Sequence, residues 1–181
     1  RSMDFNGVKT SFYKDNELSN EIPDHSETPN ITLNSFFHKT GELDLETAIL
    51  LPADHNGETT LPVLLDPYGG PHAQRVRKAR GLFGVSQWFA DQGFAVVITD
   101  GRGTPGRSPN FEREVYGDLA THALTDQIDA LHSISADYDF IDLDRVAIRG
   151  WSFGGYLAAL AVIRRPDVFH AAVAGAPVTD W

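Results

Sequence analysis

The sequence predicts an α/β fold in which a mostly parallel, doubly wound sheet follows an N-terminal antiparallel hairpin. From residue 61 onward, short apolar runs alternate with helical patterns, as is typical of buried parallel strands covered by helices on both faces. Before residue 61, two strand-like runs flank the turn residues 40–42, which indicates a hairpin. A G-x-S-x-G pentapeptide at 150–154 lies between a strand pattern and a helix pattern, as a sharp strand-to-helix turn requires.

Each element follows from the local pattern. Residues 1–30 are polar and irregular, and they indicate a connector with one strand near 11–13. The runs 32–39 and 44–51 are expected to pair as the hairpin. Further strands are expected at 62–65, 95–99, 145–149 and 169–175, and helices at 86–92, around 124–131 and at 153–164. A long loop is expected from residue 101 to about residue 110.

Composition excludes several classes of protein. The chain has 181 residues, enough for one domain with a real core, and its net charge of −10 argues against nucleic acid and anionic membrane surfaces as partners. The only basic cluster, residues 75–80, is interpreted as a solvated loop. No apolar run approaches the roughly 20 residues that span a membrane, and the N-terminus shows no secretory signal pattern. The absence of cysteine excludes disulfides and thiolate catalysis and favours a reducing, cytoplasmic compartment.

The pentapeptide Gly150-Trp151-Ser152-Phe153-Gly154 is the strongest chemical signal in the chain. A sharp strand-to-helix turn lifts a serine Oγ out of the fold. The flanking glycines are expected because a side chain there would collide with the turn or with the neighbouring strand. The start of the following helix places backbone N–H groups beside the serine, where an oxyanion could form.

Four segments together carry a resemblance to a known family. They are Leu64–Gln74, Thr99–Thr104, Gly150–Tyr156 and Ala176–Trp181. In order and spacing they resemble the catalytic domain of the prolyl oligopeptidase family of serine peptidases, and within it the dipeptidyl peptidase IV-like branch. The resemblance covers about residues 35–181 and implies an α/β-hydrolase fold, peptide substrates and no cofactor.

The resemblance also implies roles for individual residues. Ser152 would be the nucleophile, and the oxyanion would be bound by the backbone N–H of Phe153 and the hydroxyl of Tyr68. Without the resemblance, Tyr68 would be interpreted as a packed tyrosine in a Gly/Pro turn. The ring of Phe153, with Val178 and Trp181, would line a pocket that favours proline before the scissile bond. The branch often has tyrosine where this chain has Phe153.

The triad acid and base of such a peptidase are expected beyond residue 181. In this fold the chain order is Ser, then Asp, then His, and only Asp167, Asp180 and His170 follow Ser152. His170 begins a predicted strand at the sheet end opposite the serine, so it is a poor candidate for the base. The six earlier histidines show no metal-ligand spacing, and no metal site is predicted. These histidines are at positions 25, 38, 55, 72, 122 and 132.

We therefore expect a piece of a larger protein. Residues 1–30 would be the connector and the tail of a preceding β-propeller, and 31–181 the N-terminal two-thirds of the peptidase domain, with its C-terminal part missing. The predicted function is a serine peptidase that acts on oligopeptides, of the post-proline dipeptidyl-peptidase type. An esterase that uses the same nucleophile elbow, the strand-to-helix turn at 150–154, remains as an alternative. A non-catalytic interaction or assembly fragment is a second alternative, and homo-oligomerisation remains open.

Overall fold

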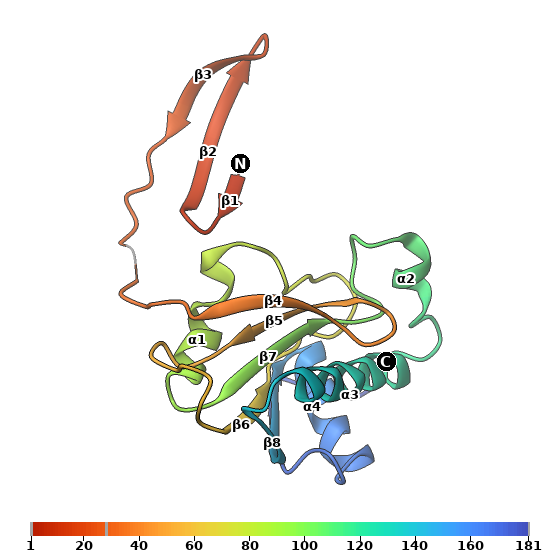
Figure 1. Cartoon of the computed structure of the whole chain (residues 1–181). Helices are drawn as coiled ribbons and strands as arrows, with labels where there is room; N and C mark the ends of the chain where they lie inside the picture. The colour runs from red at the N-terminus through yellow and green to blue at the C-terminus, as the bar shows by residue number, and fades with distance from the viewer. Residues whose placement is uncertain (1, 28, 181) are drawn as a thin grey trace.

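A computed structural model describes residues 2–27 and 29–180 (Figure 1). The strands are β1 (Ser2–Asp4), β2 (Gly7–Lys14), β3 (Glu17–Ile22), β4 (Ser35–Thr40), β5 (Leu45–Leu50), β6 (Leu61–Leu65), β7 (Ala95–Asp100), β8 (Ile141–Trp151) and β9 (Ala171–Gly175). The helices are η1, a short 3₁₀ turn (Arg80–Leu82), α1 (Gly84–Ala90), α2 (Pro109–Arg113), α3 (Thr121–Asp137) and α4 (Phe153–Arg164).

The main sheet has six strands in the order β4-β5-β7-β6-β8-β9. The pairs β4–β5 and β5–β7 are antiparallel, whereas β7–β6, β6–β8 and β8–β9 are parallel. The hairpin predicted at the N-terminal side is therefore present and joins the edge of a mostly parallel sheet. The parallel strands all run in the same direction. The segments that follow their carboxyl ends therefore lie close together, along one end of the strands.

Both faces of the sheet are covered, as the doubly wound prediction required. Alternate side chains of the buried strands point to opposite faces. One face packs against α3 and α4 through a core that includes Val63, Leu65 and Val97. The other face packs against α1 and the segment before it, through a smaller core that includes Leu64 and Val96.

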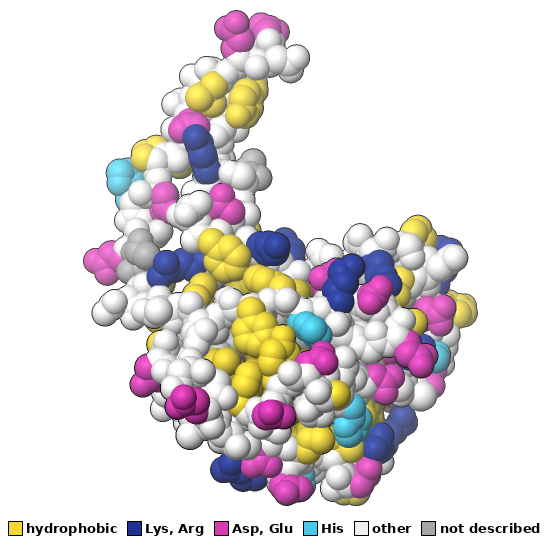
Figure 2. Space-filling view, viewed as in Figure 1, with side chains coloured by type: hydrophobic (Ala, Val, Ile, Leu, Met, Phe, Trp, Pro, Cys, Tyr) yellow, Lys and Arg dark blue, Asp and Glu magenta, His cyan; other side chains and the backbone are white. Residues whose placement is uncertain are grey.

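The structure confirms the strand predicted near 11–13, which lies in β2, but residues 2–27 contain more regular structure than the predicted irregular segment. Strands β1, β2 and β3 form a three-stranded antiparallel sheet, which extends away from the main sheet as an arm with acidic side chains near its tip (Figures 1 and 2). Its residues are mostly exposed, so the sequence shows no apolar alternation there. The missed signal is the pair Asp15-Asn16, both with positive φ, because a two-residue hairpin turn needs residues that tolerate this conformation.

Two further elements depart from the sequence pattern. Strand β8 begins at Ile141, four residues before the predicted strand, and α2 occupies part of the segment expected to be a loop. That loop is fixed at its start by Arg102, whose guanidinium donates two hydrogen bonds of 2.6 and 2.9 Å to Asp126 Oδ1 on α3. Asp126 is fully buried, so the pair ties the segment after β7 to the helix layer.

Candidate active site

Ser152 stands at a sharp turn between β8 and α4. Its backbone has φ 56° and ψ −117°, a combination that costs about 1–3 kcal/mol and persists only where the surrounding structure enforces it. Two backbone hydrogen bonds hold the turn: Ser152 N donates to Gly175 O at 2.9 Å, and Tyr156 N donates to Ser152 O at 3.0 Å. The strand–turn–helix context predicted for the pentapeptide is therefore present.

The flanking glycines are required by close approach. A Cβ on Gly150 would overlap the backbone of Gly154, one turn later. A Cβ on Gly154 would lie 2.7 Å from Pro67 O, in the segment that follows β6. The first contact closes the elbow on itself, and the second seats the loop of Tyr68 directly on the first turn of α4.

The loop after β6 brings Tyr68 to the elbow. The ring of Tyr68 is half-buried, and its centroid lies 6.0 Å from that of Phe153, with an interplanar angle of 38°. Gly70 lies under the same Phe153 ring, because a Cβ there would overlap the ring atoms. Segments 84 residues apart in sequence, at Tyr68 and Ser152, are thus adjacent in the fold.

The three residues predicted to line a substrate pocket have different surroundings. The side chain of Phe153 is 1% exposed and belongs to the core, so in this structure its ring is not accessible to a ligand. Val178 follows β9 and is 41% exposed. Trp181 lies outside the described residues. The substrate pocket therefore stays a prediction.

No histidine within the described part of the chain donates to or accepts from the Ser152 hydroxyl. His170 Nδ1 instead accepts from Val146 N at 3.1 Å, and His170 N donates to Val146 O. Val146 is six residues before Ser152 along β8, which corresponds to about 20 Å at roughly 3.3 Å per strand residue. His72 is exposed and lies in a loop, with a backbone φ of 74°. Residues 2–27 and 29–180 also contain no group of three metal-ligating side chains.

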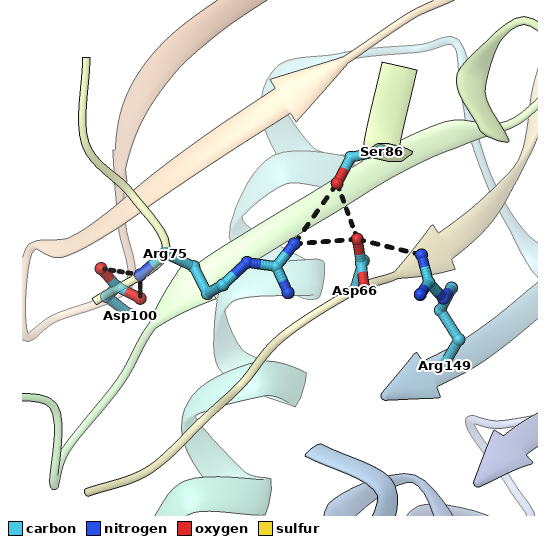
Figure 3. A network of polar contacts seen from close by, with 5 residues as sticks. All are labelled: Asp66, Arg75, Ser86, Asp100 and Arg149. Atoms are coloured by element: carbon cyan, nitrogen blue, oxygen red, sulfur yellow. Dashed lines mark hydrogen bonds and ion pairs between the residues drawn. The ribbon is translucent and has the colours of Figure 1, made fainter. Parts of the chain in front are cut away.

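A network of polar and charged side chains joins the segment before Tyr68 to the strand before Ser152, and it was not predicted from the sequence (Figure 3). Asp66, which is 1% exposed, accepts from Arg75 at 3.0 Å and from Ser86 at 2.7 Å, and pairs with Arg149 at 3.5 Å. The Arg149 guanidinium also lies 4.4 Å from the centroid of the Phe89 ring.

The basic segment 75–80 is therefore not the solvated loop that we predicted. Arg77 and Lys78 are exposed, but Arg75 pairs with Asp66, and Arg80 donates to the carbonyl oxygens of Pro29 and Ile31. The available signal was an aspartate directly after each of two apolar strand patterns, because buried carboxylates at adjacent strand ends need cationic partners.

Asp100, at the end of β7, holds the other end of the same loop. Its carboxylate accepts from Arg75 N at 2.9 and 3.1 Å and from Val76 N at 2.9 Å. Burial raises the pKa of Asp100, while these N–H groups and the nearby guanidinium charges of Arg75 and Arg77 oppose the rise. The carboxylate thus serves as a buried acceptor for backbone N–H groups that have no partner in a strand or helix.

The geometry agrees with comparisons to known proteins. The sequence profile of the prolyl oligopeptidase family matches residues 82–181, which contain the whole elbow. The chain belongs to the prolyl oligopeptidase family. This is a family of serine peptidases with the α/β-hydrolase fold. The position of Ser152 between strand β8 and helix α4 agrees with that fold.

Similar members of the family are dipeptidyl peptidases and related enzymes. Human dipeptidyl peptidase 8 is 38% identical over 148 residues, which is 80% of this chain and 16% of that protein. Human prolyl endopeptidase FAP is 34% identical over 140 residues, which is 77% of this chain and 18% of that protein. The crystal structure of Porphyromonas gingivalis dipeptidyl peptidase 4 superposes with a TM-score of 0.83 at 28% identity, covering 97% of this chain and 26% of that one.

The chain spans less than a fifth of the length of these curated relatives. Within the residues that the structure describes, no helix is long and apolar enough to cross a bilayer. The profile match and these relatives establish the family of the chain.

Proposed function

We propose that this chain forms part of the catalytic domain of a serine peptidase that cleaves oligopeptides after proline, through an acyl-enzyme on Ser152. The observation that carries the proposal is the strained Ser152 turn with the Tyr68 loop packed against the first turn of α4. Strain of this kind persists where it presents a reacting group. The family membership of residues 82–181 supports the same chemistry.

In the proposed reaction, Ser152 Oγ attacks the scissile carbonyl carbon while its proton passes to a histidine base. The carbonyl oxygen gains a negative charge, which the Phe153 N–H and the Tyr68 hydroxyl would stabilise as hydrogen-bond donors. Collapse of this intermediate breaks the C–N bond, the departing amine takes the proton from the histidine, and an ester remains on Ser152. Water then attacks the ester carbonyl while the histidine takes its proton. The histidine returns this proton to Ser152 Oγ as the acid product leaves.

We propose that a further part of the peptidase supplies the histidine and the acid that orients it. In support, the described residues provide no histidine bonded to Ser152, and His170 is fixed near Val146. The same proposal divides the chain into a connector at 1–30, which would follow a β-propeller, and the N-terminal two-thirds of a peptidase domain at 31–181. The relatives' much greater length is consistent with this arrangement.

For specificity we propose a dipeptidyl-peptidase type of activity, with Val178 and Trp181 beside the bound proline ring. The names of the relatives include both dipeptidyl peptidases and a prolyl endopeptidase. A Gly-Pro amide with a free N-terminus and the same amide with a blocked N-terminus distinguish the two. Preference for the free amine supports the dipeptidyl type, and equal turnover of the blocked amide contradicts it.

The deciding experiment compares the full-length peptidase with its Ser152→Ala variant on a Gly-Pro amide and on a short acyl ester. Loss of the wild-type nucleophile should leave at most the weak residual rate that the oxyanion site and substrate binding supply. A serine-directed fluorophosphonate probe should label the wild type and not the variant. Amide turnover that survives the substitution would remove Ser152 from the mechanism, and turnover of the ester alone would support the esterase alternative.

Tyr68→Phe tests the second oxyanion donor. The variant should lower kcat by roughly 10²–10³ with little change in KM, because the hydroxyl would act on charge that exists only in the transition state. An effect confined to KM would return Tyr68 to a packing role.

A further inference from the structure

The loop that carries Tyr68 is fastened at both of its ends by charged groups. It leaves β6 at Asp66 and reaches Arg75, whose guanidinium returns to donate to Asp66 Oδ2 at 3.0 Å. The backbone N–H groups of Arg75 and Val76 donate to the carboxylate of Asp100, on the neighbouring strand β7. Arg75 therefore closes the loop through its side chain and anchors it through its backbone (Figure 3).

Asp66 connects this closed loop to the strand of the nucleophile. The same oxygen that accepts from Arg75 accepts from Ser86 on α1 at 2.7 Å and pairs with Arg149 on β8 at 3.5 Å. Asp66 is two residues before Tyr68, and Arg149 is three residues before Ser152. The buried carboxylate of Asp66 thus links the two segments that carry the proposed reacting groups.

Packing on α4 holds one side of this loop, because added Cβ atoms on Gly69 and Gly70 would overlap Leu157 and the Phe153 ring. Gly69 has φ 76°, and the pair Gly69-Gly70 follows Tyr68 directly, so the unfastened loop would have more backbone freedom than most segments. A displacement of about 1 Å at a catalytic group can lower the rate roughly 100-fold. The fastening at Arg75 therefore adds a restraint on Tyr68 to the packing of the glycines on α4.

We propose that Arg75 is a positioning residue, which holds the Tyr68 hydroxyl at the oxyanion site by closing its loop onto Asp66; this inference rests on the proposed function. The described contacts of the Arg75 guanidinium are with Asp66 and Ser86, so it would act on the reaction through Tyr68. Its guanidinium fits the task because it donates to Asp66 and, at 3.3 Å, to Ser86 Oγ with the same nitrogen, which fixes its direction as well as its distance.

The test is a double-mutant cycle of Arg75→Gln and Tyr68→Phe in the full-length peptidase, with a Gly-Pro amide as substrate. Arg75→Gln should lower kcat roughly 10- to 100-fold and change KM less than threefold, because the misplaced donor acts on the transition state. In the Tyr68→Phe background the same substitution should change kcat less than threefold, since the group it positions is gone. Arg75→Lys, which keeps a cation near Asp66, should restore part of kcat.

Arg77→Gln is the matched control, because Arg77 lies in the same loop, carries the same charge and is exposed. It should keep kcat within twofold of wild type. The concentration of active enzyme in each variant is fixed by titration with the fluorophosphonate probe, so loss of folded protein is not counted as loss of kcat. If Arg75→Gln does not fold, Arg75→Lys takes its place in the cycle, with the same expected pattern at smaller amplitude.

The outcomes separate this inference from the proposed function. If Tyr68→Phe lowers kcat and the Arg75 effect is equally large in both backgrounds, the positioning role is refuted while the oxyanion role of Tyr68 stands. If Tyr68→Phe leaves kcat unchanged, the oxyanion role fails and the inference fails with it. If Arg77→Gln lowers kcat as much as Arg75→Gln, the effect comes from loop charge and the specific contact with Asp66 is refuted.

Discussion

Gly154 stands at the contact between the elbow and the loop of Tyr68, and Gly154→Ala tests whether that contact sets catalytic geometry. The residue lies in the first turn of α4, where alanine is intrinsically favoured over glycine by up to about 1 kcal/mol. Helix propensity alone would therefore predict a neutral or stabilising change. The packing predicts the opposite, because the added methyl group meets backbone atoms of another segment.

The size of the effect follows from the distances. An added Cβ would lie 2.7 Å from Pro67 O, whereas ordinary van der Waals contact begins at 3.4 Å. The atom it meets belongs to the backbone, so the loop must move by roughly 0.7 Å rather than rotate a side chain away. Pro67 directly precedes Tyr68, and the displacement passes to the proposed oxyanion donor. We expect kcat to fall roughly 10- to 100-fold, since about 1 Å of misplacement can cost 100-fold.

The assay measures kcat and KM of the full-length peptidase on a Gly-Pro amide, with active enzyme counted by fluorophosphonate titration. Gly84→Ala is the control, because Gly84 begins α1 and an added Cβ there meets nothing within 4 Å. The control should keep wild-type kcat and gain slightly in stability. A Gly154→Ala enzyme with wild-type kcat would show that the elbow and the Tyr68 loop are not rigidly coupled, and the reasoning would be wrong.

Three further predictions concern the chain itself. The 181-residue chain alone should not hydrolyse a Gly-Pro amide above its Ser152→Ala control, because none of its described histidines bonds to Ser152; hydrolysis would place the base within the chain. Arg102→Met should lower the free energy of unfolding in urea by about 3 kcal/mol, because Asp126 is fully buried beside it. The control Lys39→Met breaks an exposed pair with Glu46 and should lower the free energy of unfolding by less than about 1 kcal/mol. Equal effects of the two substitutions would contradict the role of burial. Asp118→Ala should cost about 1 kcal/mol at neutral pH, because the carboxylate accepts from Thr121 N and Ala120 N at the start of α3. The Thr121 side chain and the N–H groups of Thr121 and Ala120 lower the pKa of Asp118 from 3.8 to about 2. The contribution of Asp118 is therefore present above pH 3.8 and is lost as the pH falls toward 2, so a difference between wild type and variant that persists undiminished near pH 2 would refute it.

Most of the main sheet could be predicted because each of its buried strands carries its own pattern. The runs 62–65 and 95–99 are apolar throughout, as strands buried on both faces must be, and the structure places β6 and β7 there. The arm of β1 to β3 could not be found in this way, because its residues are exposed and leave no apolar alternation. Only the strand near 11–13, which the sequence predicted and which lies in β2, and the turn at Asp15-Asn16 held local signals.

The candidate site likewise has one part that the local sequence predicts and another part that it does not. Ser152 and its glycines form one continuous motif between a strand pattern and a helix pattern, so local sequence predicted the elbow, and the structure confirms the turn. Tyr68 has no local signal of chemistry, and its choice depended on the family resemblance. The partners Asp66, Arg75 and Arg149 are separated by up to 83 residues. Their association depends on the order of strands in the sheet, which no single stretch of sequence encodes.

The strand order also explains why the informative sequence segments are where they are. Four neighbouring strands, β7, β6, β8 and β9, run in parallel, so their carboxyl ends lie along one edge of the sheet. Each contributes to the site at that end: β7 with Asp100, β6 with Asp66 and the loop of Tyr68, β8 with Ser152, and β9 with Gly175, whose carbonyl accepts from Ser152 N. Ligand sites of open α/β sheets form at this edge. Three of the four segments that carried the family resemblance overlap such a strand end, and the fourth begins at Ala176, directly after β9. The two buried carboxylates, Asp66 and Asp100, lie at the carboxyl ends of β6 and β7, where they hold the two ends of the loop that carries Tyr68.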